Sequence, residues 1–85
     1  MSPKPNPEMG RELLASELVV ETVVVVGRAD RPHCFTVWVK SLGEDFVAFL
    51  AGDINMIFVA FRRDDGTLID DSGARIHVWE YLGEV

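Results

Sequence analysis

Few side chains in this sequence are suited to covalent or acid–base chemistry: Cys34 is the only cysteine, and His33 and His77 are the two histidines. A thiolate nucleophile needs a base beside it. His33 cannot serve Cys34 within a strand, because neighbouring strand residues point to opposite faces, and His77 would have to approach from another strand. We therefore interpret Cys34 as a small buried hydrophobic side chain and predict no catalytic residue.

A second group of side chains could bind a ligand or a partner. His77, Trp79 and Tyr81 alternate along the last apolar segment and so share one face of a strand, and Trp38 lies on one face of an earlier strand. Aromatic faces of this kind form ligand platforms or subunit interfaces. They also fill the interiors of small barrels, so burial in the core is the alternative.

Acidic residues gather at two glycine-containing segments, Asp64-Asp65-Gly66 and Asp70-Asp71-Ser72-Gly73. Their spacing does not match an EF-hand loop, which needs ligands at alternate positions and a closing Glu. We therefore predict two turns, no metal site and no cofactor. The phosphate, dinucleotide, zinc and serine-hydrolase signatures are also absent. Their absence favours a protein that is not an enzyme.

Composition limits the partners and the compartment. The net charge of −6 disfavours binding to nucleic acid, although it leaves room for a local basic patch. A single cysteine cannot form an intrachain disulfide, and the first residues lack the apolar stretch of a signal peptide. No apolar run is long enough to span a membrane as a helix. We expect a cytoplasmic protein without membrane association.

The N-terminal segment predicts a tail followed by a helix. Prolines at every second position from Pro3 to Pro7 indicate a flexible, extended tail over residues 1–7, before a single domain over residues 8–85. Asn6 could cap a short helix over Pro7–Ser16, with Pro7 at its first position. Leu14 and Leu18, four residues apart, would share one face of such a helix.

The rest of the chain is dominated by strand patterns. The consecutive β-branched residues Thr22–Val26 strongly favour a strand over a helix. Apolar alternation predicts further strands, and the complete set is Glu17–Val26, His33–Lys40, Phe46–Leu50, Ile54–Arg63, Thr67–Asp70 and Arg75–Leu82.

Two of these strands have a helical alternative. Ser41 and Glu44 match a capping box and Gly52 matches a helix stop, so residues 42–51 could also form a helix. We predict a strand there because both sides of Phe46–Leu50 are apolar. Residues 75–82 alternate as a strand, and Gly83 leaves a terminal helix as the alternative.

The most apolar stretch is Ile54–Arg63, in which every residue from Met56 to Phe61 is apolar. Strand side chains alternate, so both faces of this strand would be apolar. We therefore expect this strand at the centre of the fold, covered on both faces. The sequence does not decide whether that cover comes from the same chain or from a neighbour.

These patterns predict a mostly β fold, at the margin of the α+β class: a short N-terminal helix, then about five or six antiparallel strands in a strongly curved sheet or small barrel. The chain has 85 residues, of which 48% are hydrophobic, and a body of this size has little interior to fill. The surplus of apolar side chains favours self-association into a homo-oligomer.

Two segments resemble the motifs of the Sm-like family. The first motif of that family is similar to Gly43-x-x-Phe46-x-Ala48-x-Leu50 followed by Asp53-Ile54-Asn55-Met56. The second motif is similar to Gly66-Thr67-Leu68 with Gly73-x-x-Ile76. The resemblance implies a bent five-stranded sheet with an N-terminal helix, assembly into rings, and RNA binding. It would place Asp53, Asn55 and Arg75 at the RNA site.

Three functions remain open from the sequence. The first is a small β-rich interaction module that self-associates and has no catalytic activity. The second is the Sm-like, ring-forming RNA-binding protein. The third is a small barrel that binds a ligand on an aromatic face formed by Trp38, His77, Trp79 and Tyr81.

Overall fold

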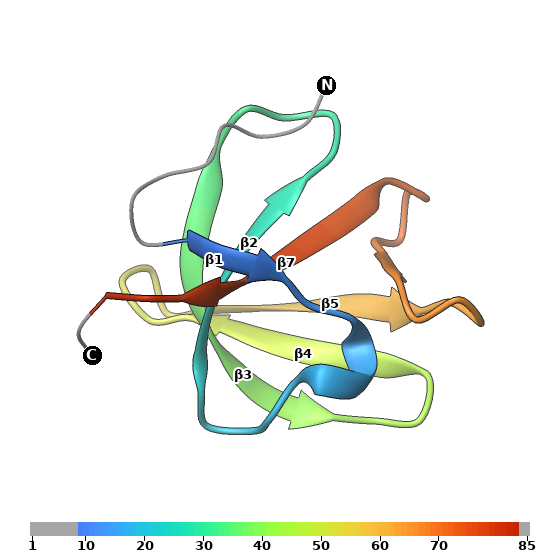
Figure 1. Ribbon diagram of the computed structural model, residues 1–85, viewed down its shortest axis with the longest axis horizontal. Helices are drawn as coiled ribbons and strands as arrows, with labels where there is room; N and C mark the ends of the chain where they lie inside the picture. The colour runs from blue at the N-terminus through green and yellow to red at the C-terminus, as the bar shows by residue number, and fades with distance from the viewer. Residues whose placement is uncertain (1–8, 84–85) are drawn as a thin grey trace.

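The computed structural model describes residues 9–83, which form a closed six-stranded antiparallel barrel with one additional strand (Figure 1). The elements in chain order are β1 (Met9–Glu12), the 3-10 helix η1 (Ala15–Glu17), β2 (Val23–Arg28), β3 (Cys34–Leu42), β4 (Phe46–Ala51), β5 (Met56–Arg62), β6 (Leu68–Ile69) and β7 (Arg75–Tyr81). The predicted mostly β, antiparallel fold is confirmed, and of the two predicted forms, a curved sheet or a small barrel, it takes the barrel.

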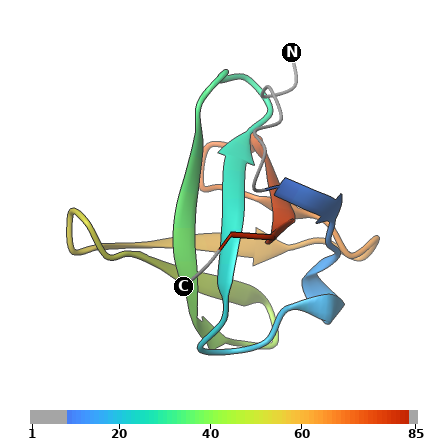
Figure 2. The same ribbon diagram turned by 60° about the vertical axis from the view of Figure 1, so that its left-hand side comes forward.

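The barrel closes at β7. One edge of β7 pairs with β2, and the other edge pairs with β6 near Arg75 and with β1 near Tyr81. The remaining neighbours follow the chain, in the order β2, β3, β4, β5, β6. Figures 1 and 2 show that β2 and β3 run across the direction of β5. The pairing of β3 with β4 is irregular between Val39 and Ser41, where an extra residue lets a strand bend.

The interior is filled by alternate residues of the strands and by one turn of helix. Phe49, Val37, Val39 and Val47 are almost fully buried, and Phe49 stacks on Phe58 with ring centroids 5.2 Å apart. Ala15 and Leu18, which flank η1, belong to the same buried cluster and cover one end of the barrel. The loop between β2 and β3 lies at the other end (Figure 2).

The segment with a helical alternative at residues 42–51 forms the strand β4. Phe49 on β4 faces Phe58 on β5, and Val47 faces Ala60, so these inward side chains fill the core. A helix over the same residues would turn part of this apolar set away from the interior. The terminal segment likewise forms the strand β7, as predicted.

The prediction of an N-terminal helix over Pro7–Ser16 is wrong for the residues that the structure describes. Met9–Glu12 is a strand, and only the short 3-10 turn Ala15–Glu17 is helical. Gly10 lies against Glu80 so closely that an added Cβ would be 2.9 Å from its Cβ, which is a close contact between strands. The segment is therefore extended because it pairs with the part of the β7 edge that β6 leaves unpaired. The predicted tail at residues 1–7 lies outside the described residues.

The strand predicted over Glu17–Val26 begins later than expected, at Val23. Glu17 ends η1, and its carboxylate accepts hydrogen bonds from the Leu14 amide at 2.7 Å and from the Arg11 guanidinium at 2.8 Å. Glu21 has φ 70°, in the left-handed region, which interrupts an extended strand. The polar residues of this segment thus form a turn before the β-branched run.

Within a single chain, the strand predicted over Ile54–Arg63 is covered on one face only. Phe58 and Ala60 of β5 point into the barrel, whereas Ile57, Val59 and Phe61 point outward and are 58%, 40% and 42% exposed. The barrel has only one apolar interior, so a strand that is apolar on both faces leaves one face outside it.

Candidate interaction surface and barrel pocket

The outward side chains of three neighbouring strands form a continuous apolar area. Cross-strand partners in an antiparallel sheet project from the same face. Trp38 on β3 is paired with Leu50 on β4, which is paired with Ile57 on β5. The next rows pair Ala48 with Val59 and Phe46 with Phe61. We call this area the outer apolar patch and define it by its larger members, which are Trp38, Phe46, Leu50, Ile57, Val59 and Phe61.

The outer apolar patch is open to solvent. Trp38 and Phe46 are 37% and 38% exposed, similar to Val59 and Phe61, and no member of the patch is charged. Its exposed side chains amount to an area on the order of 400 Å², given that an aromatic residue carries about 150–250 Å². Patches of this size on small proteins often mark binding surfaces.

The structure places the four aromatic residues predicted as a ligand or interface site on the outer face of the barrel. Trp38 is paired with Val23 of β2, and Trp79 is paired with Val25, two residues further along the same strand. Val23 and Val25 project from one face, so both tryptophans lie on that face, on either side of β2. Of the four residues, only Trp38 belongs to the outer apolar patch.

His77 and Trp79 are held in place by neighbours within the chain. Their rings stack with centroids 5.5 Å apart, and Nδ1 of His77 lies 2.8 Å from a carboxylate oxygen of Glu12 on β1. The His77 side chain is only 15% exposed. The Glu12 contact links β1 to an outward side chain of β7, and neither pocket described below includes His77 or Trp79.

The three residues that the Sm-like resemblance assigns to RNA do not lie together. Asp53 and Asn55 are in the turn between β4 and β5, which projects from one side of the barrel in Figures 1 and 2. Arg75 begins β7 on the other side, and its Nη2 forms an ion pair with Glu12 at 3.2 Å. The resemblance stays an expectation from the sequence.

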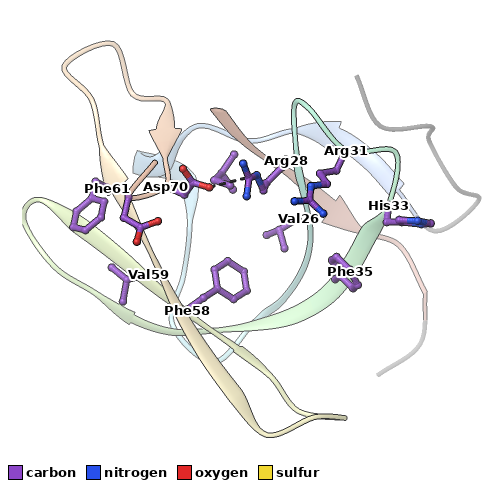
Figure 3. Close-up of a pocket in the computed structure, with 12 residues that line it drawn as sticks. Val26, Arg28, Arg31, His33, Phe35, Phe58, Val59, Phe61 and Asp70 are labelled. Atoms are coloured by element: carbon purple, nitrogen blue, oxygen red, sulfur yellow. Dashed lines mark ion pairs between the residues drawn. The ribbon is translucent and has the colours of Figure 1, made fainter. Parts of the chain in front are cut away.

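A pocket of about 580 Å³ opens in the barrel wall where β6 ends (Figure 3). The barrel is closed there by only two residue pairs between β5 and β6, and the outer edge of β5 has no described strand beside it before Phe61. Val26 and Phe58 line the pocket from opposite walls, and Phe35 lies near the β2–β3 loop. Phe35 is 62% exposed, although its partner Val26 is in the core. We name this space the barrel pocket.

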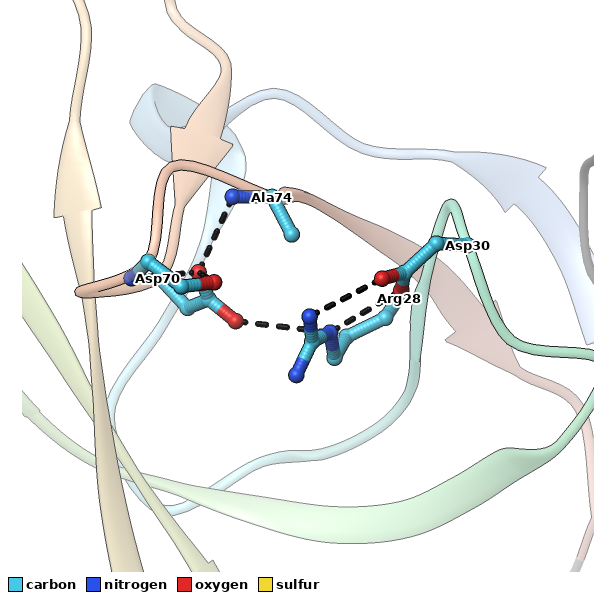
Figure 4. Close-up of polar contacts among 5 residues, drawn as sticks. Arg28, Asp30, Asp70 and Ala74 are labelled. Carbon is cyan, nitrogen blue, oxygen red and sulfur yellow. Dashed lines mark hydrogen bonds and ion pairs between the residues drawn. The ribbon is translucent and has the colours of Figure 1, made fainter.

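One wall of the barrel pocket is polar (Figure 4). Arg28 donates two hydrogen bonds of 3.0 Å to the Asp30 carboxylate, and its Nε is 3.4 Å from an oxygen of Asp70. The other oxygen of Asp70 accepts hydrogen bonds from the Ser72 hydroxyl at 2.7 Å, the Ser72 amide and the Ala74 amide. These interactions, the Ser72 hydroxyl first, hold the pKa of Asp70 below its usual value.

Arg31, in the loop between β2 and β3, also lines the barrel pocket. Its guanidinium makes no hydrogen bond or ion pair within the part of the chain that the structure describes, and its side chain is exposed. Nη1 of Arg28 likewise has no partner among residues 9–83, because the contacts of Arg28 use Nε and Nη2. The rim of the pocket therefore offers unused hydrogen-bond donors.

A second hollow of about 860 Å³ lies between the first half of β3 and the β4–β5 turn. It is lined by Trp38, Met56 and the inward Phe35 and Phe58, and so adjoins the barrel pocket. Cys34 also lines it, and partial burial raises the pKa of the Cys34 thiol. A raised pKa disfavours the thiolate, which is the nucleophilic form of a cysteine.

The barrel pocket could not be identified from the sequence. Alternation places Phe35 in a strand, but it does not place that side chain opposite Phe58. The useful signal was the short segment between the turns at Asp64-Asp65-Gly66 and Asp71-Ser72-Gly73, which has only four residues, two of which form β6. So short a strand cannot close the whole length of a barrel wall.

Comparisons with known proteins identify no relative: no family model, curated protein or solved structure matches this chain. Within residues 9–83, no helix is long and apolar enough to cross a membrane. The same residues contain no cluster of three or more His, Cys, Asp or Glu side chains suited to a metal ion.

Proposed function

We propose that this protein is a small β-barrel interaction module that self-associates by packing the outer apolar patch of one copy against that of another. The observation that carries the proposal is the outward exposure of Ile57, Val59 and Phe61 on the most apolar strand of the chain. Leaving these side chains in water forgoes about 25 cal/mol for each Å² of apolar surface. A second copy would remove them from water.

The arrangement of the patch suits a two-fold dimer. In such a dimer the same surface is used twice, so it must be complementary to itself. An uncharged patch meets this condition, because two copies bring no like charges into contact. Its exposed area, about 400 Å² of apolar side chain, is also what the apolar centre of a standard interface needs, given about 800 Å² buried on each partner.

The substitution Ile57→Lys tests this proposal. Ile57 is 58% exposed, so the lysine remains in water in the single chain and should change the free energy of unfolding by no more than about 0.5 kcal/mol. In the dimer it would bury an unpaired charge, and we expect the dissociation constant to rise at least about tenfold. Sedimentation velocity over a range of protein concentrations measures the change.

Val19→Lys is the matched control. Val19 is 60% exposed and lies in the segment between η1 and β2, outside the patch. It should associate like the unaltered protein while carrying the same added charge. Equal weakening of association by both lysines would show that the effect is not specific to the patch. No effect of Ile57→Lys on an existing oligomer would place the interface elsewhere and refute the proposal.

A further inference from the structure

We propose that the barrel pocket binds a small organic carboxylate, with an apolar or aromatic body between Phe35, Phe58 and Val26 and the carboxylate at Arg31. This proposal does not depend on the proposed self-association, although two of the residues that line the pocket, Val59 and Phe61, also belong to the outer apolar patch. Ligand sites are concave and mostly apolar, with a few polar groups that orient the ligand. The barrel pocket has this character, and its volume of about 580 Å³ is ample for a molecule of one ring.

The apolar part of the site comes from side chains that belong to the interior but are not fully covered. Phe58 packs partly against the core and Phe35 is 62% exposed at the open wall. Figure 3 shows Val26 and Phe58 directed into the space between the strands, with Phe35 beyond Val26. A ring inserted there would cover surface that the chain leaves in water, while the barrel itself need not open.

The charge at the rim favours an anion at Arg31. Both oxygens of Asp70 and both oxygens of Asp30 are already engaged, by Arg28 or by the β6–β7 turn. The guanidinium of Arg31 is not engaged by any described side chain, and a planar fork of N–H donors matches a carboxylate. Asp71, in the β6–β7 turn, lines one side of the pocket. Its negative charge would repel an anion toward Arg31.

The probes we would use are 3-phenylpropanoate and the uncharged 3-phenylpropan-1-ol, which have the same ring and chain. Each is titrated into ¹⁵N-labelled full-length protein while amide chemical shifts are recorded. For ligands of this size we expect a dissociation constant in the low-millimolar range or tighter for the carboxylate. Saturable shifts should concentrate in Gly27–Phe35 and Phe58–Phe61.

Two variants identify the contacts. Arg31→Gln should weaken binding of the carboxylate about three- to tenfold and leave the alcohol nearly unchanged, as expected for an exposed charge-assisted contact. Phe35→Ser should weaken the binding of both probes. Its effect on the free energy of unfolding should be small, because Phe35 is 62% exposed. Val19→Ser, which removes an exposed apolar side chain outside the pocket, is the control and should bind both probes normally.

Ile57→Lys separates this site from the self-association, because Ile57 does not line the barrel pocket. That variant should bind 3-phenylpropanoate with unchanged affinity even where it no longer associates. Three results would overturn the proposal. They are no saturable shifts, shifts centred on the patch members outside the pocket (Trp38, Phe46, Leu50 and Ile57), and equally weakened binding of both probes in Arg31→Gln. None of them would bear on whether the patch mediates self-association.

Discussion

Asp70 illustrates how single acidic residues act in this protein. It lies directly after β6, and its carboxylate connects the β6–β7 turn to Arg28 at the end of β2. Gly73 in the same turn has φ 90°, a conformation that only glycine adopts without strain. The acidic segment therefore forms a turn, as its sequence predicts, and it also forms one wall of the barrel pocket.

Replacing Asp70 with Asn tests this role through its pH dependence. The folded-state pKa of Asp70 lies below the ordinary value of 3.8, so the ionised carboxylate is favoured in the folded state. Its contribution is present at neutral pH and is lost as the pH falls through the folded-state pKa. We expect Asp70→Asn to lower the free energy of unfolding by about 1 kcal/mol at pH 7. The difference from the unaltered protein should shrink below about pH 4.

Urea denaturation at several pH values measures this difference. The control is Asp71→Asn, since the Asp71 carboxylate makes no hydrogen bond or ion pair within residues 9–83. Asp71→Asn should change stability little at any pH. A constant deficit of Asp70→Asn down to pH 3 would show that the charge of Asp70 is not what stabilises the turn.

The strand β6 is short, yet it has a large effect on the closure of the barrel. Its two residues close the barrel, with Leu68 paired to Arg62 on one side and to Ile76 on the other. Leu68 is 2% exposed and belongs to the core, whereas Ile69 points the other way and is half-buried. The interior contact of one side chain therefore secures the junction of β5 with β7.

Leu68→Ala should lower the free energy of unfolding by about 2–4 kcal/mol, because it removes buried apolar atoms and leaves a cavity at the junction. Ile69→Ala on the same strand removes a similar volume from the other face and should cost less than about half as much. Chemical denaturation of both variants gives the comparison. Equal costs for the two alanines would mean that the burial of Leu68 does not determine the closure of the barrel.

The strands were predictable because their signals are local. The β-branched run at Thr22–Val26 and the alternation in His33–Lys40 and Arg75–Leu82 give the side-chain direction without knowledge of the fold. The N-terminal strand β1 was not predictable in this way. It forms on an edge of β7 more than seventy residues later in the chain, as the pairing of Met9 with Tyr81 shows.

The candidate sites also differ in how far local sequence patterns can predict them. The aromatic residues Trp38 and Trp79 could be chosen from alternation alone, and the structure places both on the outer face. The exposure of Ile57 depends on which face of β5 the barrel encloses, which alternation cannot decide for a strand that is apolar on both sides. The barrel pocket depends on the point where β6 ends and on contacts across the barrel.

At the scale of the whole molecule, two opposing forces act on association. The outer apolar patch favours contact between copies, whereas each chain carries a net charge of −6 and repels the other at long range. Added salt screens this repulsion and slightly strengthens the burial of apolar surface. Association through the patch should therefore tighten with ionic strength, while binding to a nucleic-acid backbone would weaken.

The most direct test is the absolute mass of the unaltered full-length protein, measured by light scattering over a range of concentrations at low and high salt. We expect the mass to rise toward about twice that of the chain as concentration increases, as for a two-fold dimer. The rise should begin at a lower concentration in about 0.5 M salt than in about 0.05 M salt. A mass that stays at that of a single chain throughout would contradict self-association, and the exposed patch would then need another partner or none.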